Sequence, residues 1–252
     1  HKAYDGGINF FDTARAYSDS EQKVGAAFSS MRERIVLATK TGAQTAEGFW
    51  KDLETSLRTL KTDYIDIYQF HNPAFCPKPG GADGLYDAAL EAKKQGKIRH
   101  ISITNHRLAV AHEAIDSGLY ETLQFPFSYL SSVQELHLVE ACSRQNMGFI
   151  AMKGLAGGLI HNSKAAMAYM TQFDNVLPIW GIQKISELEE WLSYMENTPS
   201  MDEEISAYIE KEKLELTGDF CRGCGYCMPC PAGIMINQCA RMSLMLRRAP
   251  SA

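Results

Sequence analysis

The amino-acid sequence predicts an α/β protein, a (β/α)8 barrel of parallel strands followed by a small helical, cysteine-rich segment. Short apolar runs typical of buried strands alternate regularly with stretches rich in Ala, Leu, Glu and Lys that have helical periodicity. Such alternation requires a parallel sheet covered by helices. A doubly wound nucleotide-binding sheet normally carries a Gly-x-Gly-x-x-Gly turn after its first strand. None is present here, which favours closure into a barrel.

The predicted strands are apolar runs bounded by polar residues or turn residues. The first contains Ile8, Phe10 and Phe11 and stops abruptly at Asp12. The others are Ile35–Thr39, Ile65–Phe70, Ile98–Ile103, Thr122–Phe125, Phe149–Met152 and Val176–Ile179.

Apolar residues at helical spacing and end signals predict the helices between these strands. Gly96 is the expected C-terminal stop of one helix, and Ser186 with Glu189 predicts a capping box at the start of another. Two apolar faces stand out: Trp50, Leu53, Leu57 and Leu60, and then Leu85, Ala88, Ala89 and Ala92.

A barrel of this kind has eight strands, whereas the sequence provides seven βα units and begins on what resembles the end of a helix, Lys2 to Tyr4. We therefore expect that the first βα unit is missing and that the C-terminus is also cut. The pattern becomes acidic and helix-prone near Thr198, so residues 1–197 are expected to form the barrel and residues 198–252 a second segment.

The composition of the chain argues against two classes of binding partner. The chain has 252 residues and a formal net charge of −5, which argues against nucleic acid or an anionic membrane because both require a basic face. No apolar run approaches the roughly 20 residues needed to span a bilayer, and the N-terminus does not resemble a signal peptide. These features predict a cytoplasmic protein.

Four polar residues at or just after successive strand ends form a candidate catalytic set: Asp12, Tyr17, Lys40 and His71. Each alone has an ordinary explanation as a cap, a surface residue or a turn. Together they suit proton transfer, because a tyrosine has a pKa of about 10 and needs a nearby cation to act as a general acid near neutrality. Lys40 is the expected cation, Asp12 would hold its ammonium, and His71 could hydrogen-bond a carbonyl oxygen.

Three stretches resemble the aldo/keto reductase family: Gly-Ile-Asn-Phe-Phe-Asp-Thr-Ala-x-x-Tyr, Leu-Ala-Thr-Lys and Tyr-Gln-Phe-His-Asn. The similarity extends from residue 1 to about residue 196. It implies a (β/α)8 barrel, NADPH bound without a Rossmann fold, and hydride transfer to a small-molecule carbonyl substrate. It also implies that Tyr17 is the proton donor, Lys40 and Asp12 its tuning pair, and His71 the substrate-orienting group.

The resemblance also implies cofactor-binding positions. Thr104 and Asn105, with Gln124, correspond to residues that hydrogen-bond the nicotinamide carboxamide. Met152 stands where many members have a tyrosine that stacks on the nicotinamide ring, and Met152 could pack there less specifically.

Lys153 and Gly154 follow Met152, and a glycine there could let the backbone approach the pyrophosphate or could simply form a turn. Gly181, Lys184 and the helix expected at Ser186 form the candidate anion site. The strong basic pair often found there is missing, so NADPH and NADH both stay open.

The second constellation is a run of cysteines, Cys221, Cys224, Cys227 and Cys230, followed by a proline. This spacing resembles ferredoxin motifs and favours a 4Fe-4S cluster over zinc, which more often uses two separated pairs. The segment is similar to the tail of an aldo/keto reductase subgroup with ferredoxin-type motifs, which implies a possible redox partner protein. Either Cys230 or Cys239 could be the fourth ligand, or Cys230 could serve a second cluster.

The sequence thus predicts an NAD(P)H-dependent oxidoreductase that reduces an aldehyde or ketone, with an appended iron–sulfur segment. The alternative is a non-catalytic nicotinamide-binding or electron-transfer protein. A metal-dependent barrel hydrolase is disfavoured because no His-x-His pair occurs at a predicted strand end.

Overall fold

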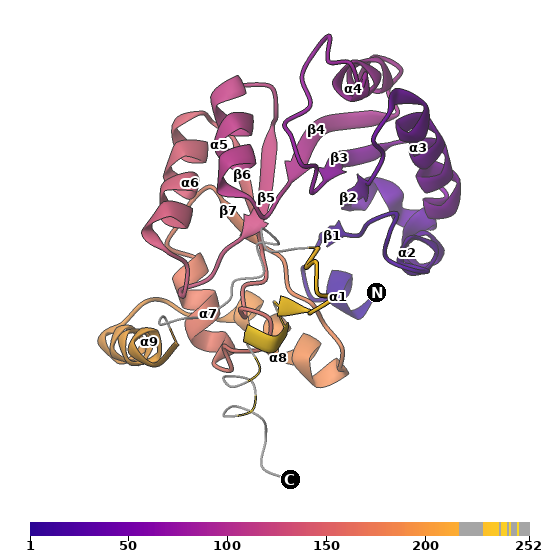
Figure 1. The fold of residues 1–252 in the computed structure, drawn as a ribbon. Helices are drawn as coiled ribbons and strands as arrows, with labels where there is room; N and C mark the ends of the chain where they lie inside the picture. Colours follow the sequence, from indigo (N-terminus) through magenta and orange to yellow (C-terminus); the bar gives the residue numbers. More distant parts are fainter. Residues whose placement is uncertain (217–228, 237, 241, 243–245, 247–252) are drawn as a thin grey trace. The chain divides into compact units, whose positions relative to one another are not determined.

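The computed structural model describes residues 1–216, 229–236, 238–240, 242 and 246 (Figure 1). The chain divides into two compact units. The first comprises His1–Asn105, Ala109–Gln124 and Ala141–Gly148, and the second comprises His106–Leu108, Phe125–Glu140 and the chain from Phe149 onward. No helix among the described residues is long and apolar enough to cross a membrane.

The first unit is built on parallel strands that neighbour one another in chain order. A doubly wound sheet reverses its strand order at a switch point, whereas a barrel does not, so this order is that of successive barrel units. Each predicted strand is confirmed to within two residues at either end. The strands are β1 (Phe10–Asp12), β2 (Val36–Thr41), β3 (Ile65–His71), β4 (Ile98–Thr104) and β5 (Thr122–Pro126).

Helices of the first unit pack against its strands (Figure 1). The residues of the two predicted apolar faces are buried, except Trp50, which is partly buried. The Thr45 side chain caps one helix by accepting a hydrogen bond from the Gly48 N–H at 3.2 Å. The backbone at Gly96 has φ +75°, as expected after a helix end. The helical elements are α1 (Lys2–Asp5), α2 (Ser20–Phe28), the 3-10 helix η1 (Ser29–Arg34), α3 (Ala46–Leu60), α4 (Leu85–Lys94) and α5 (Leu108–Ser117).

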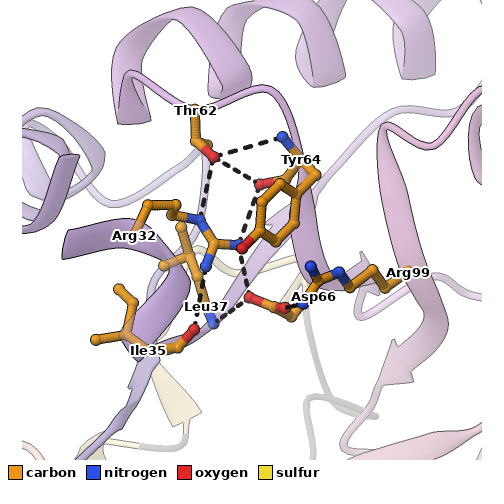
Figure 2. Close-up of polar contacts among 7 residues, drawn as sticks. All are labelled: Arg32, Ile35, Leu37, Thr62, Tyr64, Asp66 and Arg99. Carbon is orange, nitrogen blue, oxygen red and sulfur yellow. Dashed lines mark hydrogen bonds and ion pairs between the residues drawn. The ribbon is translucent and has the colours of Figure 1, made fainter. Parts of the chain in front are cut away.

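A buried carboxylate, Asp66, joins the N-terminal ends of β2 and β3 (Figure 2). Its oxygens accept hydrogen bonds from Arg32 at 2.5 Å, from Arg99 at 2.7 Å and from the Leu37 backbone N–H at 2.9 Å. Both guanidinium groups also lie over the Tyr64 ring, 4.1 and 3.9 Å from its centroid. This cluster fixes the strands at the end away from the candidate catalytic residues.

The second unit contains the parallel strands β6 (Gly148–Met152) and β7 (Val176–Pro178). Its helix α9 (Glu203–Leu216) packs against α7 (Ser163–Met170) around a core that includes Leu130, Ile205 and Ile209. The Tyr129 hydroxyl donates a 2.5 Å hydrogen bond to Glu212 on α9. The remaining helices are α6 (Val133–Arg144) and α8 (Ile185–Glu196).

Candidate active site

The strand register of the first unit brings the candidate catalytic residues to one edge. Parallel pairing aligns Asp12 with Ala38 and Lys40 with Gln69, so the strands end together. After β1 the loop stays attached to β2, because the Arg15 N–H donates to the Lys40 carbonyl at 3.0 Å. The loop then turns and returns Tyr17 toward the strand ends.

Lys40 and Asp12 form a buried ion pair. The Lys40 Nζ lies 2.5 Å from the Asp12 Oδ2 and donates a second hydrogen bond to the Thr13 carbonyl at 2.8 Å. The Gln69 amide donates to the other Asp12 oxygen at 3.0 Å. The Lys40 side chain is 1 % exposed, so both charges depend on these partners rather than on water.

Tyr17 and His71 complete the group. Their rings meet edge to face with centroids 5.7 Å apart, and the Lys40 Nζ lies 5.1 Å from the centre of the Tyr17 ring. The structure therefore brings together all four predicted residues. Tyr17 is 45 % exposed, so its ring remains accessible to a small molecule.

The electrostatics of the site follow from burial. Burial raises the pKa of Asp12 and lowers the pKa of Lys40, and the opposite charge of each residue counteracts the effect on the other. Burial, followed by the charge of Lys40, lowers the pKa of His71 below 6.5, so the imidazole is neutral at pH 7.

The pKa of Tyr17 corrects a sequence-based expectation. Lys40 was expected to lower it, but partial burial and then the negative charge of Asp12 raise the pKa of Tyr17 above 10. The reason is that the Lys40 ammonium is directed at Asp12 and at the Thr13 carbonyl. Tyr17 is thus fully protonated at neutral pH.

The predicted carboxamide-binding residues are all buried in the first unit, namely Thr104, Asn105 and Gln124. The Asn105 side-chain amide donates to the Pro73 carbonyl at 2.9 Å. The Gln124 Nε2 lies 3.5 Å from Asp12, while its Oε1 has no hydrogen-bond partner within the part of the chain that the structure describes. A buried acceptor of this kind suits a ligand that brings an N–H donor.

Among the predicted cofactor residues of the second unit, Gly154 has a local structural explanation. Gly154 is a glycine because a Cβ there would lie 2.5 Å from the Trp180 indole, which stacks on Trp191 with centroids 3.9 Å apart. Met152 is partly buried, and Lys153 has φ +58°. Gly181 and Lys184 are exposed.

The capping box predicted from Ser186 and Glu189 is wrong. Because the backbone is still extended at Lys184, the helix begins at Ile185, and Glu187 closes its start. The Glu187 carboxylate accepts from the backbone N–H groups of Lys184 at 3.1 Å and Gln183 at 2.7 Å, and these bonds lower the pKa of Glu187. The Glu187 carboxylate thus places a negative charge at the start of the helix, beside the candidate anion site.

Most of the cysteine site lies outside the described residues, namely Cys221, Cys224 and Cys227. Cys230 is partly exposed and Cys239 exposed. In the part of the chain that is described, no group of three or more His, Cys, Asp or Glu residues is arranged to hold a metal ion.

A profile of the aldo/keto reductase family matches residues 1–176. The chain belongs to this family. It is an oxidoreductase, and the family resemblance of the sequence is confirmed.

Among its relatives is an uncharacterised oxidoreductase, YqkF of Bacillus subtilis, which is 27% identical over 81% of this chain and 70% of its own length. A 6-dehydroglucose reductase of Novosphingobium aromaticivorans is 36% identical, over 42% of this chain and 40% of its own length. A Klebsiella pneumoniae aldo/keto reductase in complex with NADP and acetate has the same fold, with a TM-score of 0.71 at 22% identity over 83% of this chain and 82% of that one.

Two site residues were missed at the level of sequence. Gln69 binds Asp12 from β3, and its signal was a polar residue two positions before His71, which places it on the same face of the strand. Glu21 is 2 % exposed although it lies in the first turn of α2, and no sequence pattern distinguishes it from a solvated helix residue.

We expect Lys40→Met to lower the free energy of unfolding by about 3–5 kcal/mol at pH 7, because it leaves the Asp12 carboxylate buried without its counter-charge. The folded-state pKa of Asp12 is raised above its unfolded value near 3.8, and loss of Lys40 raises it further. At pH values between the Asp12 pKa of the unfolded chain and that of the folded variant, the folded variant binds more protons than the unfolded chain. The stability of the variant therefore falls as pH rises. The deficit relative to wild type should therefore shrink on acidification, as measured by urea denaturation between pH 7 and about 4.5.

The matched control is the double variant Asp12→Asn/Lys40→Met, which holds no buried charge at this position. Its own free energy of unfolding should show no contribution from Asp12 titration over this range. A single-variant deficit that stays constant over the same range would show that Asp12 is not the uncompensated group.

Proposed function

We propose that this chain reduces an aldehyde or ketone to an alcohol with NADPH or NADH, and that Tyr17 is the proton donor. The observation that carries the proposal is the Lys40–Asp12 ion pair beside the edge-to-face pair of Tyr17 and His71. Family membership and the NADP bound by the Klebsiella protein support it.

The residues of the site have distinct roles in this proposal. When bound, the nicotinamide cofactor supplies a hydride to the carbonyl carbon. The Tyr17 hydroxyl donates its proton to the carbonyl oxygen, and solvent then returns a proton to the phenolate. The Lys40 ammonium is the cation beside the tyrosine, 5.1 Å from the centre of its ring. Asp12 holds Lys40 in place, and the neutral imidazole of His71 donates a hydrogen bond to the same carbonyl oxygen.

The buried residues of the first unit fit the cofactor. Gln124 provides an unpartnered acceptor for a carboxamide N–H, and Thr104 and Asn105 are its neighbours at the ends of β4 and β5. The family resemblance implies further cofactor contacts at Met152, Lys153, Gly154, Gly181 and Lys184.

The choice between NADPH and NADH depends on the start of α8. Lys184 favours a 2′-phosphate there, whereas the Glu187 carboxylate places negative charge at the same helix start. The proposal therefore includes both NADPH and NADH as cofactors.

Tyr17→Phe should lower kcat for carbonyl reduction by about 100-fold or more, since it removes the proton that neutralises the developing alkoxide. The dissociation constant for NADPH should stay within about twofold of wild type because the aromatic ring is retained. Steady-state kinetics with a small aldehyde, together with fluorescence titration of NADPH, measure both quantities.

The control is Tyr64→Phe, which removes a hydroxyl from the Arg32–Asp66 cluster and should keep wild-type turnover. Normal turnover by Tyr17→Phe would disprove the assignment of the proton donor.

For the C-terminal segment we propose a 4Fe-4S cluster held by Cys221, Cys224 and Cys227, with Cys230 as the fourth ligand. The support is the repeated two-residue spacing of four thiols followed by proline. If electrons pass between this cluster and a partner protein, the chain would also serve as an electron carrier, which is the second candidate function.

Anaerobic reconstitution with iron and sulfide should leave about four irons and four sulfides on each chain. Cys224→Ser should lose the cluster, whereas Cys142→Ser, which alters a buried thiol in the first unit, should keep it. Binding of one zinc ion without sulfide would contradict the cluster. Bleaching of its absorbance by NADPH without a carbonyl compound would favour the electron-carrier role.

A further inference from the structure

We infer that Glu21 is a positioning residue for Tyr17, a buried carboxylate that fixes the loop carrying the tyrosine to β2 and α3. This inference rests on the proposed function. It concerns residues 13–21 of the first unit, where the chain leaves β1, turns through Tyr17 and enters α2.

Glu21 accepts hydrogen bonds from three different parts of the first unit. Its Oε1 accepts hydrogen bonds from the Thr39 hydroxyl of β2 and the Ser56 hydroxyl of α3, both at 2.7 Å. Its Oε2 pairs with the Arg15 guanidinium from the loop. A carboxylate provides the acceptor capacity for all three donors, and the guanidinium compensates its charge.

The contacts of Glu21 lead directly to the catalytic pair. Thr39 immediately precedes Lys40, and successive side chains of a strand point to opposite faces. Glu21 therefore binds the helix-covered face of β2 at the point where Lys40 occupies the other face. Arg15 is attached twice, because its side chain pairs with Glu21 while its N–H donates to the Lys40 carbonyl at 3.0 Å.

Tyr17 lies on the short turn between Arg15 and α2. Its N–H donates to the Ala14 carbonyl at 3.0 Å, and its carbonyl accepts from the Ser20 N–H at 2.9 Å. Ser18 has φ +46°, a left-handed conformation that an L-residue adopts at a cost. Such a conformation persists where surrounding contacts fix it, and the Arg15–Glu21 pair supplies one of these contacts.

The reach of Glu21 to α3 depends on close helix packing. A Cβ on Gly25 would lie 2.6 Å from the Thr59 carbonyl oxygen, so α2 lies directly against the end of α3. Glu21 is one helical turn before Gly25 and therefore faces Ser56, about one turn before Thr59 on α3. The helix packing thus places a charged side chain beneath the loop.

Another buried carboxylate of this unit, Asp66, is a natural control. Like Glu21 it is bound by arginine and accepts a hydrogen bond from β2, but it acts where the chain enters β2 and β3 (Figure 2). Loss of charge there should reduce stability without displacing Tyr17. Comparison of the two carboxylates separates positioning from general support of the fold.

The test is Glu21→Gln. The glutamine oxygen can still accept from Thr39 and Ser56, but the amide nitrogen cannot accept from Arg15. We expect kcat for carbonyl reduction to fall about tenfold or more, since a small misplacement of a reacting group has effects of this size. The dissociation constant for NADPH should stay within about twofold of wild type. Asp66→Asn should lower the urea midpoint but leave kcat within about twofold of wild type.

Arg15→Met provides a second test that leaves Glu21 bound to Thr39 and Ser56, and it applies even if Glu21→Gln does not fold. It should lower kcat by a similar factor, and the double variant should lose no more than either single variant because both break one contact. Wild-type kcat in Arg15→Met, or an equal loss of kcat in Asp66→Asn, would overturn the inference. If wild-type protein reduces no carbonyl compound, the proposed function fails instead.

Discussion

The ion pair between Lys40 and Asp12 is the interaction on which the site of this protein depends. Two charges removed from water cost several kcal/mol each unless other groups replace the solvent. Here the Thr13 carbonyl and the Gln69 amide do so, and both reach the pair because β1, β2 and β3 run parallel and end together. The register of the sheet therefore determines which groups can stabilise the buried ion pair.

The two ends of these strands carry different kinds of polar cluster. At the C-terminal ends, Lys40, Asp12 and His71 leave a tyrosine partly exposed. At the N-terminal ends, Arg32, Asp66 and Arg99 enclose the Tyr64 ring and satisfy backbone groups. This division between an end that serves chemistry and an end that serves stability is characteristic of barrel folds.

Much of the fold could be predicted from the sequence because strand ends and helix faces are local patterns. Apolar runs that stop at Asp12, Lys40 or His71 indicate where side chains converge, and family motifs then indicate their roles. The pKa of Tyr17 could not be predicted in the same way, because its direction depends on whether Lys40 or Asp12 acts more strongly on the hydroxyl in three dimensions.

Other features of the structure could not be predicted from the sequence, for equally physical reasons. The start of α8 depends on the extended backbone at Lys184, which let Glu187 take the capping position predicted for Glu189. The sequence left Gly154 open as a cofactor approach or a turn, and the close approach of Trp180, which local patterns do not show, is a further reason for a glycine there. Glu21 had no sequence signal, because its burial results from the packing of α2 on α3.

The central claim is that Tyr17 donates the proton from a pKa raised above 10, and the pH dependence of kcat/KM for carbonyl reduction tests it most directly. Because only the protonated phenol can donate, kcat/KM should stay constant from neutrality to about pH 10 and fall above it. A fall centred below about pH 9 would contradict the account, since it would mean that a group with a lower pKa supplies the proton.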